Sequence, residues 1–322
     1  MAEPGVTDST VTVRPADPAE MPALRALRRD VFADEQGIAA ELITDEHDAD
    51  AVHIVAVRGG KLIGIGRLVA GSSESSVSAE SSVSAASAGS AGKIGRLATR
   101  PADRGAGVGA AVMRELERQA RERGLAEVRL HALDSARSFY ERIGYRAYGE
   151  VFLEAGRAHI AMRKPLPVLR PALDTGSAAL IELIGGCFAE YPGCVLAVDE
   201  EEPWLRRPAS AYTEAGGRLW VVELDGAVVA CIGHKPHAGE PSELKNLYVA
   251  AAARRHGIGG WLVGMVEEAA RSAGATSIVL WSDTRFLDAH RLYSRLGYAR
   301  TGGTRELHDL SNTVEYEFTR SL

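Results

Sequence analysis

A six-residue pattern suited to anion binding occurs twice in the chain. The first copy is Arg104-Gly105-Ala106-Gly107-Val108-Gly109 and the second is Arg254-Arg255-His256-Gly257-Ile258-Gly259, so both read Arg-x-x-Gly-x-Gly. Glycine takes positive φ angles at little cost and lets successive backbone N–H groups come close together. Where such a turn opens a helix, the positive end of the helix dipole adds its attraction, which indicates a site for an anion such as a pyrophosphate.

The neighbouring residues predict the elements that position these turns. Each turn follows a short apolar run, at 94–99 and at 244–249. After each turn, apolar residues recur every four positions until Gly124 or Gly274. This predicts a strand, a glycine-rich turn and a helix in both places. A P-loop and a dinucleotide site are disfavoured, since the first would need Gly-Lys-Ser/Thr and the second an acidic residue ending a second strand.

The two turns belong to a longer repeat. Arg254 lies 150 residues after Arg104, and a second motif, Ala-x-x-(Phe/Leu)-Tyr-x-x-x-Gly-Tyr, contains Tyr140 in its first copy and Tyr293 in its second. A repeat of this length predicts two copies of one domain. We place an N-terminal domain at 1–165 and a C-terminal domain at 166–322, with a short proline-containing linker between them.

The ordered motifs resemble the GNAT superfamily of N-acetyltransferases over almost the whole chain. The resemblance implies an α/β fold of two tandem GNAT-type domains, each a mixed, mainly antiparallel sheet of about six to seven strands flanked by helices. In the first half, Val31-Phe32-x-x-Glu35-Gln36, the acidic stretch 41–50 and the segment 152–162 resemble the ElaA-like branch. The two-domain layout is similar to that of mycothiol synthase, whose halves are unequal.

The resemblance implies acetyl-CoA as the cofactor. The backbone amides of the two turns would hold its pyrophosphate, and the ends of the preceding strands would line its pantetheine arm and offer an N–H to the thioester oxygen. The expected cofactor-binding residues are Leu97, Ala98, Thr99, Arg104, Gly105, Ala106, Gly107, Val108, Gly109, Leu247, Tyr248, Val249, Arg254, Arg255, His256, Gly257, Ile258 and Gly259.

The expected catalytic residues are Glu243, Tyr293 and Tyr140. Both tyrosines match the family's tyrosine that protonates the leaving thiolate, although a helix-face tyrosine can also simply pack the helix onto the sheet. Glu243 resembles a placement that the family uses for its general base. The first half has Lys93 at that position, and a lysine needs burial to lower its pKa before it can act as a base.

The first half therefore needs a base from elsewhere. The candidates are Glu35, Asp45, Glu46, His47 and His53. The acidic stretch that holds three of them is interpreted as a solvated face, or alternatively as an attraction for a cationic amine. His131 and His159 are expected to be strand residues rather than ligands, and no metal site is recognised.

Composition sets the remaining limits. A chain of 322 residues with 46% hydrophobic and 25% charged residues is typical of a globular protein of two domains. The net charge of −6 argues against nucleic acid as a partner. Three cysteines, the lack of a signal peptide and the lack of a membrane-spanning apolar run predict a cytoplasmic protein with no membrane partner.

Two segments depart from the repeat. Ten of the 22 residues at 71–92 are serine, which predicts a disordered loop. Residues 281–286 are expected to form a polar loop that the first half lacks.

We expect an acetyl-CoA-dependent N-acetyltransferase that acts on a primary amine of a small molecule or peptide. The alternatives are a half that binds acyl-CoA without turnover, as a sensor or structural partner, and a mycothiol-synthase-like or antibiotic-modifying acetyltransferase. The acceptor itself and the oligomeric state, monomer or homodimer, are left open.

Overall fold

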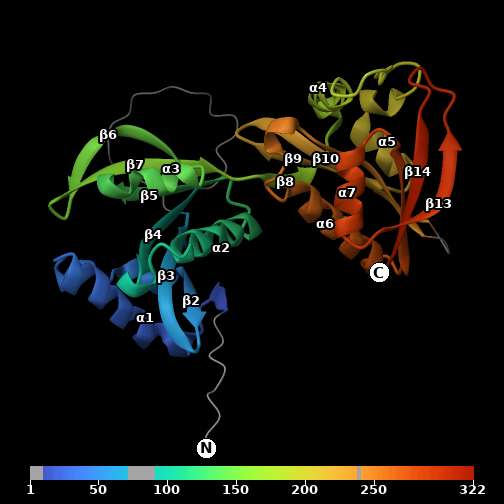
Figure 1. Cartoon of the computed structure of the whole chain (residues 1–322). Coiled ribbons are helices and arrows are strands. Elements are labelled where there is room, and N and C mark those ends of the chain that lie inside the picture. Colours follow the sequence, from blue (N-terminus) through green and yellow to red (C-terminus); the bar gives the residue numbers. More distant parts are fainter. Residues whose placement is uncertain (1–9, 72–90, 238–240) are drawn as a thin grey trace, which may run out of the picture. The chain divides into compact units, whose positions relative to one another are not determined.

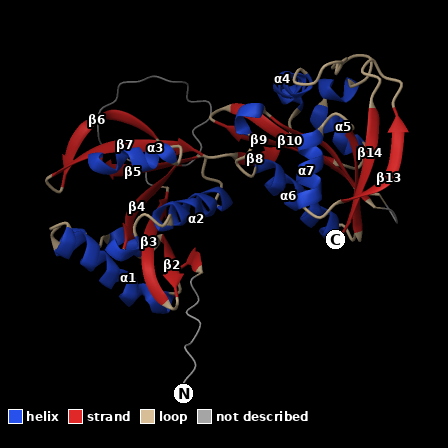
Figure 2. Cartoon of the chain, viewed as in Figure 1, coloured by secondary structure: helices blue, strands red, loops and turns tan. Residues whose placement is uncertain are grey.

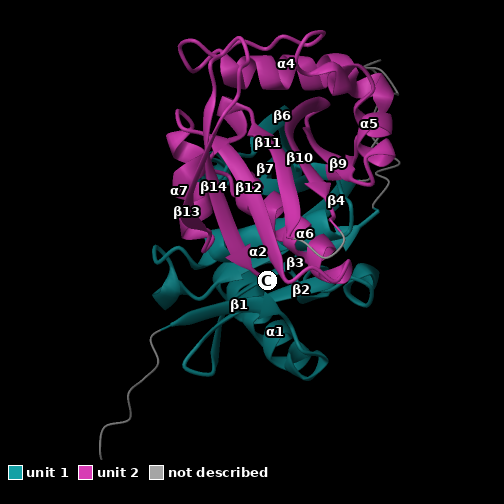
Figure 3. Ribbon diagram, turned by 90° about the vertical axis from the view of Figure 1, so that its right-hand side faces the viewer, with its two compact units in different colours: residues 1–168 teal, residues 169–322 magenta. Residues whose placement is uncertain are grey.

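The computed structural model describes residues 10–71, 91–237 and 241–322 (Figure 1). The chain divides into two compact units, residues 1–168 and 169–322 (Figure 3). Most of the predicted serine-rich loop, residues 72–90, lies outside the described residues. Its last two residues, Ala91 and Gly92, begin a strand, so the predicted loop extended too far.

The first unit contains one seven-stranded sheet. Its strands are β1 (Val11–Pro15), β2 (Val52–Arg58), β3 (Lys61–Ala70), β4 (Ala91–Thr99), β5 (Glu127–Leu133), β6 (Arg146–Glu154) and β7 (Arg157–Pro165). They lie in the order β1-β2-β3-β4-β5-β7-β6, and every neighbouring pair is antiparallel except β4 and β5. The helices are α1 (Met21–Arg28), α2 (Val108–Glu122) and α3 (Arg137–Arg142), as Figure 2 shows.

The second unit repeats this arrangement. Its strands are β8 (Val168–Pro171), β9 (Arg218–Leu224), β10 (Ala227–Lys235), β11 (Ser242–Val249), β12 (Ser277–Asp283), β13 (Ala299–Glu306) and β14 (Val314–Ser321). Their order, β8-β9-β10-β11-β12-β14-β13, matches that of the first unit strand for strand. The helices are α4 (Ser177–Phe188), α5 (Pro208–Glu214), α6 (Ile258–Ser272) and α7 (Leu287–Arg295). The predicted fold class and the internal duplication are confirmed.

Two boundaries differ from the sequence-based expectation. The first helical region continues past Phe32 as a π-helical turn, Arg29–Glu35. The segment expected as a polar loop at 281–286 begins as strand, because Trp281, Ser282 and Asp283 pair with β14. The loop is therefore shorter than predicted.

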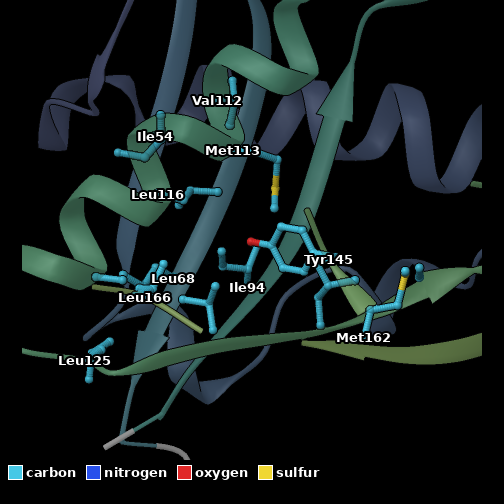
Figure 4. Packing of buried hydrophobic residues seen from close by; sticks show 14 of the residues in the cluster. Ile54, Leu68, Ile94, Val112, Met113, Leu116, Leu125, Tyr145, Met162 and Leu166 are labelled. Atoms are coloured by element: carbon cyan, nitrogen blue, oxygen red, sulfur yellow. The ribbon is translucent and has the colours of Figure 1, made fainter. Parts of the chain in front are cut away.

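Helices pack on both faces of each sheet. In the first unit, α2 buries Val112, Met113 and Leu116 against one face (Figure 4). On the other face α1 buries Leu24 and Leu27. The second unit places α6 over one face and α4 with α5 over the other. Burial of these apolar faces stabilises each unit and fixes where each glycine-rich turn begins.

The approach of α2 to the sheet depends on missing side chains. A Cβ atom at Gly64 of β3 would lie 2.6 Å from Val108 Cγ1, and one at Gly66 would lie 2.7 Å from Leu116 Cδ1. Glycine at these two positions allows the helix to lie close on the strand. Since Val108 is the first residue of α2, this contact also sets the position of the turn.

Candidate active site

The two Arg-x-x-Gly-x-Gly segments adopt the same backbone conformation. Gly107 (φ +77°) and Gly257 (φ +80°) are the N-caps of α2 and α6, and no side chain caps either helix. Gly105 (φ +77°) corresponds to Arg255, which takes the same left-handed conformation at φ +64°. The first N–H groups of each helix have no partner within the helix, so the donors that an anion needs are present in both units.

The arginines of the two motifs act as clamps. Arg104 donates two hydrogen bonds to Glu35, at 2.8 and 2.6 Å, and one to the Thr99 carbonyl. Arg254 binds Glu190 at 2.5 and 2.6 Å and the Val249 carbonyl in the same way. Both guanidinium groups thus tie the strand end to the segment that follows the first helix of their unit. Because both guanidinium groups are engaged in this way, the motif's backbone N–H groups, rather than these two side chains, are the candidates for binding phosphate.

A gap in each sheet lies beside the turn. Strands β4 and β5 pair in parallel only at residues 91–93 and 127–129, although both strands continue further. Strands β11 and β12 pair only at residues 242–243 and 278–279. Beyond these points the strands separate. At the separation, Arg96 (φ +53°) and Asn246 (φ +51°) lie in the left-handed region, beside a shift of register with the neighbouring strand. Strained residues of this kind concentrate at functional sites.

In the first unit the gap opens into a cavity of about 870 Å³. Its lining joins the strand end, the glycine-rich turn and the helix that carries Tyr140. Of the residues expected to bind the cofactor in this half, it includes Leu97, Ala98, Thr99, Arg104, Gly105, Gly107, Val108 and Gly109, and omits Ala106. The structure therefore brings the predicted residues of the first half together in one cavity.

In the second unit a cavity of about 420 Å³ lies along β11 and β12. Glu243, Leu247, Tyr248 and Tyr293 line it. Val249 and the turn residues 254–259 do not. The predicted catalytic pair and the strand thus share a cavity, while the glycine-rich turn of this half lies outside its lining.

Both predicted tyrosines occupy a dual position, in a core and in a cavity wall. Tyr140 packs its ring edge against Phe139 and Tyr145, and Tyr293 packs against Tyr298 and Phe318. Burial raises the pKa of Tyr140 to about 12 and raises the pKa of Tyr293 well above its usual range. Each hydroxyl carries its proton at neutral pH, as tyrosine ordinarily does, so the rise in pKa by itself does not distinguish a proton donor from a packing residue.

Glu243 lies on β11 in the cavity wall, with 16% of its side chain exposed. Lys245 Nζ approaches one carboxylate oxygen at 3.2 Å, and His237 Nε2 lies 3.9 Å from the other. Lys93 occupies the corresponding place on β4 and lines the first cavity. The difference between the halves that the sequence indicated is thus present in the structure.

The structure engages most of the first-half base candidates elsewhere. Glu35 is bound by Arg104, and Asp45 by Arg67 and Arg96. His53 is buried, and its ring lies 3.2 Å from Arg28 Nη2. Glu46 and His47 are exposed in a short 3-10 turn and are absent from the cavity lining.

The interpretation of the acidic stretch as a solvated face holds for Glu46 and His47, which are exposed, and is wrong for Asp48. Asp48 is only 8% exposed and receives Arg28 at 2.6 Å and Arg67 at 2.7 Å. Asp45 pairs with Arg67 and Arg96, which lowers the pKa of Asp45 to about 2. The charges of Asp45 and Asp48 are thus paired with arginines of the same unit.

A histidine–glutamate pair in the first cavity was not singled out from the sequence. His131 Nδ1 lies 2.8 Å from Glu154 Oε2, and both residues line the cavity together with His159. The alternation of β5 could have placed His131 on the same face as Leu133, but its partner is 23 residues away at the end of β6. No local sequence pattern predicts the contact between His131 and Glu154.

Within the described ranges, no group of three or more His, Cys, Asp or Glu side chains is arranged to hold a metal ion. Among the helices of residues 10–71, 91–237 and 241–322, none is both long and apolar enough to span a membrane.

Comparison with known proteins places both halves in one family. A family model described as an acetyltransferase (GNAT) domain matches residues 30–166, and one described as the acetyltransferase (GNAT) family matches residues 180–298. The chain therefore belongs to the GNAT family of acetyltransferases, with one domain in each half.

Individual relatives match about half of the chain. An uncharacterized N-acetyltransferase of Bacillus subtilis, YjcF, is 33% identical over 139 residues, which is 43% of this chain and 87% of the relative. The crystal structure of Escherichia coli ElaA is 24% identical and covers 48% of this chain and 99% of its own, with a TM-score of 0.39. The structure of a Salmonella typhimurium acetyltransferase with its cofactor acetyl-CoA is 18% identical, with a TM-score of 0.39. It covers 48% of this chain and 94% of its own.

Proposed function

We propose that this chain is an acetyl-CoA-dependent N-acetyltransferase that transfers the acetyl group to a primary amine of a small molecule or peptide. One observation carries the proposal. In the first unit, a single cavity runs from an uncapped helix N-terminus along a separated strand to the half-buried Tyr140. This arrangement fits a long ligand with phosphate at one end and a reactive group at the other. A solved relative that holds acetyl-CoA is consistent with it.

The chain would divide the work among a few groups. The amides that follow Gly107 and Gly257 bind phosphate, and the strand ends near Thr99 and Val249 hold the arm. When bound, acetyl-CoA supplies an acyl group activated as a thioester. In the second unit, Glu243 takes a proton from the acceptor nitrogen at its carboxylate.

The proton-donor role falls to the buried Tyr293 and the half-buried Tyr140. Tyr293 retains a proton on its hydroxyl because burial disfavours the phenolate, and Tyr140 does so in the first unit. Both line the cavities in which the reaction would occur.

The second cavity supports an amine acceptor. Its wall contains carboxylates and aromatic rings, and two of its acids are already paired, Asp283 with Arg285 and Glu315 with Arg305. Glu202 also lines it and accepts a hydrogen bond from the Trp204 indole. Burial raises the pKa of Glu202. A positively charged ammonium entering here would meet aromatic faces and a lining in which six acidic side chains stand against four basic ones, Lys235, Lys245, Arg285 and Arg305.

The test is calorimetric titration of the full chain with acetyl-CoA. Two binding sites are expected, one removed by Gly107→Leu and the other by Gly257→Leu, because each new side chain fills the opening in front of a helix N-terminus. Gly124→Leu and Gly274→Leu are matched controls, since these glycines have φ of +71° and +82° and end the same helices. Equal effects of test and control variants, or no binding by the unaltered chain, would refute the proposal.

A second candidate function concerns the first unit alone. Lys93 at the base position favours a domain that binds acyl-CoA without turnover. Under that alternative, Glu243→Gln abolishes all acetylation by the full chain. Residual activity in Glu243→Gln would assign turnover to the first unit.

A further inference from the structure

The first unit has few groups in its cavity that could accept a proton near neutral pH. Among the residues that line it, the candidates are Asp103, His131, Glu154 and His159. Asp103 is bound by Arg58 at 2.7 Å. Lys93 holds the place of Glu243 and is a cation. Among the described residues of this lining, the remaining candidates for a base lie on β5, at the end of β6 and on β7.

The contact between His131 and Glu154 determines the tautomer of the ring. The hydrogen bond from His131 is the main cause that lowers the pKa of Glu154, so this carboxylate is ionised and can only accept. The Nδ1 atom of His131 must therefore carry the proton at the 2.8 Å contact. A neutral imidazole protonated at Nδ1 has its lone pair on Nε2, and a carboxylate on Nδ1 makes that nitrogen more basic.

The location of His131 is also suitable. Parallel pairing with β4 ends at Arg129, so His131 lies on β5 where the sheet has already opened. Tyr140, from the helix after β5, lines the same cavity. The equivalent residue in the second unit is Trp281, three positions after Ile278 as His131 is after Val128, and it lies under the guanidinium group of Arg305. The first unit thus combines His131 on β5 with Lys93 on β4. At the equivalent positions the second unit combines Trp281 on β12 with Glu243 on β11.

We propose that His131, oriented by Glu154, is the general base of the first unit. The inference rests on the proposed function. In this step an N–H bond of the acceptor breaks, its electron pair stays on nitrogen, and the proton forms a bond to Nε2. The ring then carries one positive charge until water removes the proton. Both units would then catalyse the same reaction, the first with an imidazole base on β5 and the second with a carboxylate base on β11.

The proposal predicts different pH profiles for the two units. Glu154 contacts His131, and the other charged or titratable side chains of the same lining are Arg67, Lys93, Arg96, Asp103, Arg104, Tyr140, Arg142 and His159. Because imidazoles as a class gain a proton at higher pH than carboxylates, the acidic limb of the pH profile should lie at higher pH for the first unit than for the second.

The experiment isolates the first unit within the full chain. In a background of Glu243→Gln with Tyr293→Phe, release of free CoA thiol from acetyl-CoA is followed with benzylamine, 1,4-diaminobutane and glycinamide as probe amines. His131→Gln should lower kcat/KM by about 100-fold or more and remove the acidic limb of the pH profile. Glu154→Gln should lower it by about 10-fold and shift that limb. Acetyl-CoA affinity should be unchanged in both.

Controls separate catalysis from structure. Glu150→Gln, an exposed change on the same strand as Glu154, should leave kcat/KM unchanged. Added imidazole should restore activity to His131→Ala, which a merely structural histidine would not allow.

The possible failures are distinguishable. Activity in the background chain that is insensitive to His131→Gln, or lost instead in His159→Gln, overturns this inference and leaves the proposed function intact. No turnover by the background chain, when the unaltered chain is active, overturns it by showing that the first unit is not catalytic. No turnover of any probe by the unaltered chain counts against the proposed function and removes the basis of the inference.

Discussion

At the scale of residues, the first unit depends on a buried charge network rather than on apolar contacts alone. Arg28 is fully buried and donates to Asp48, and its other nitrogen donates to His53 Nδ1. The His53 Nε2–H must then donate to the Asp48 carbonyl, at 2.9 Å. Each polar atom in this chain of contacts depends on its neighbour.

Removing one partner should therefore be costly. We expect Asp48→Asn to lower the free energy of unfolding by about 3 to 5 kcal/mol, because Arg28 is left buried without its carboxylate. Asp50→Asn, an exposed change two residues away, should have little effect. Urea denaturation followed by circular dichroism measures both. A difference below about 1 kcal/mol between the variants would contradict the prediction.

The same network gives the pH dependence of stability. Salt bridges lower the pKa of Asp45 to about 2 and lower the pKa of Asp48. Burial lowers the pKa of His53. In each case the unfolded chain binds protons at a higher pH than the folded chain does. Stability is thus full above about pH 6.5, declines first as His53 is protonated, and falls further from about pH 4 to 2. Melting temperature against pH tests this, and a maximum below pH 5 would contradict it.

At the scale of elements, the position of each turn follows from how closely its helix approaches the sheet. In the first unit this depends on Gly64, whose missing side chain leaves room for Val108. Because valine is restricted in χ1, it cannot simply rotate away.

We expect Gly64→Ala to destabilise the protein by about 1 to 3 kcal/mol, because the added methyl group overpacks the contact. It should also weaken acetyl-CoA binding, since α2 must move together with its first turn. Gly95→Ala is a matched control for stability, because a Cβ atom there meets nothing within 4 Å. Thermal unfolding and calorimetric titration provide the two measurements. Unchanged binding alongside lowered stability would show that the turn is positioned independently of β3.

At the scale of the whole molecule, the strand order is the clearest record of duplication. The units differ in their chemistry while sharing topology, bulge and arginine clamp. We propose a domain boundary between residues 165 and 166, but the packing of Leu166 argues for a boundary slightly later in the chain. Leu166 is 2% exposed, belongs to the core of the first unit, and donates its N–H to the Ala126 carbonyl.

The boundary can be tested with separate fragments. We expect residues 1–168 to fold and to be more stable than residues 1–165 by about 2 to 5 kcal/mol, the usual effect of deleting a buried leucine side chain. Denaturation of both fragments measures the difference. Equal stabilities would place the boundary before Leu166.

Period and motif order predicted the fold and the turns because these are local in sequence or repeated in it. Contacts between distant residues escaped prediction. The buried Glu117 pairs with Lys164, and Glu267, 150 residues later, pairs with Arg320 and accepts from Tyr298. An acidic residue at one position of both helices was a visible signal, but its partner was not. The roles of Glu243, Tyr140 and Tyr293 remain predictions, because a cavity wall alone does not identify a reaction.

The short parallel pairing between the middle strands has a mechanical consequence. Each seven-stranded sheet is effectively two smaller sheets joined along three residue pairs in the first unit and two in the second. We therefore expect the distance between the two separated middle strands to be the dimension of each domain that changes most easily. A ligand that contacts both separated strands would hold them at a fixed distance and so make the whole domain more rigid. Since its middle strands share only two residue pairs, we expect the second unit to deform more easily than the first and to gain more rigidity when a ligand binds.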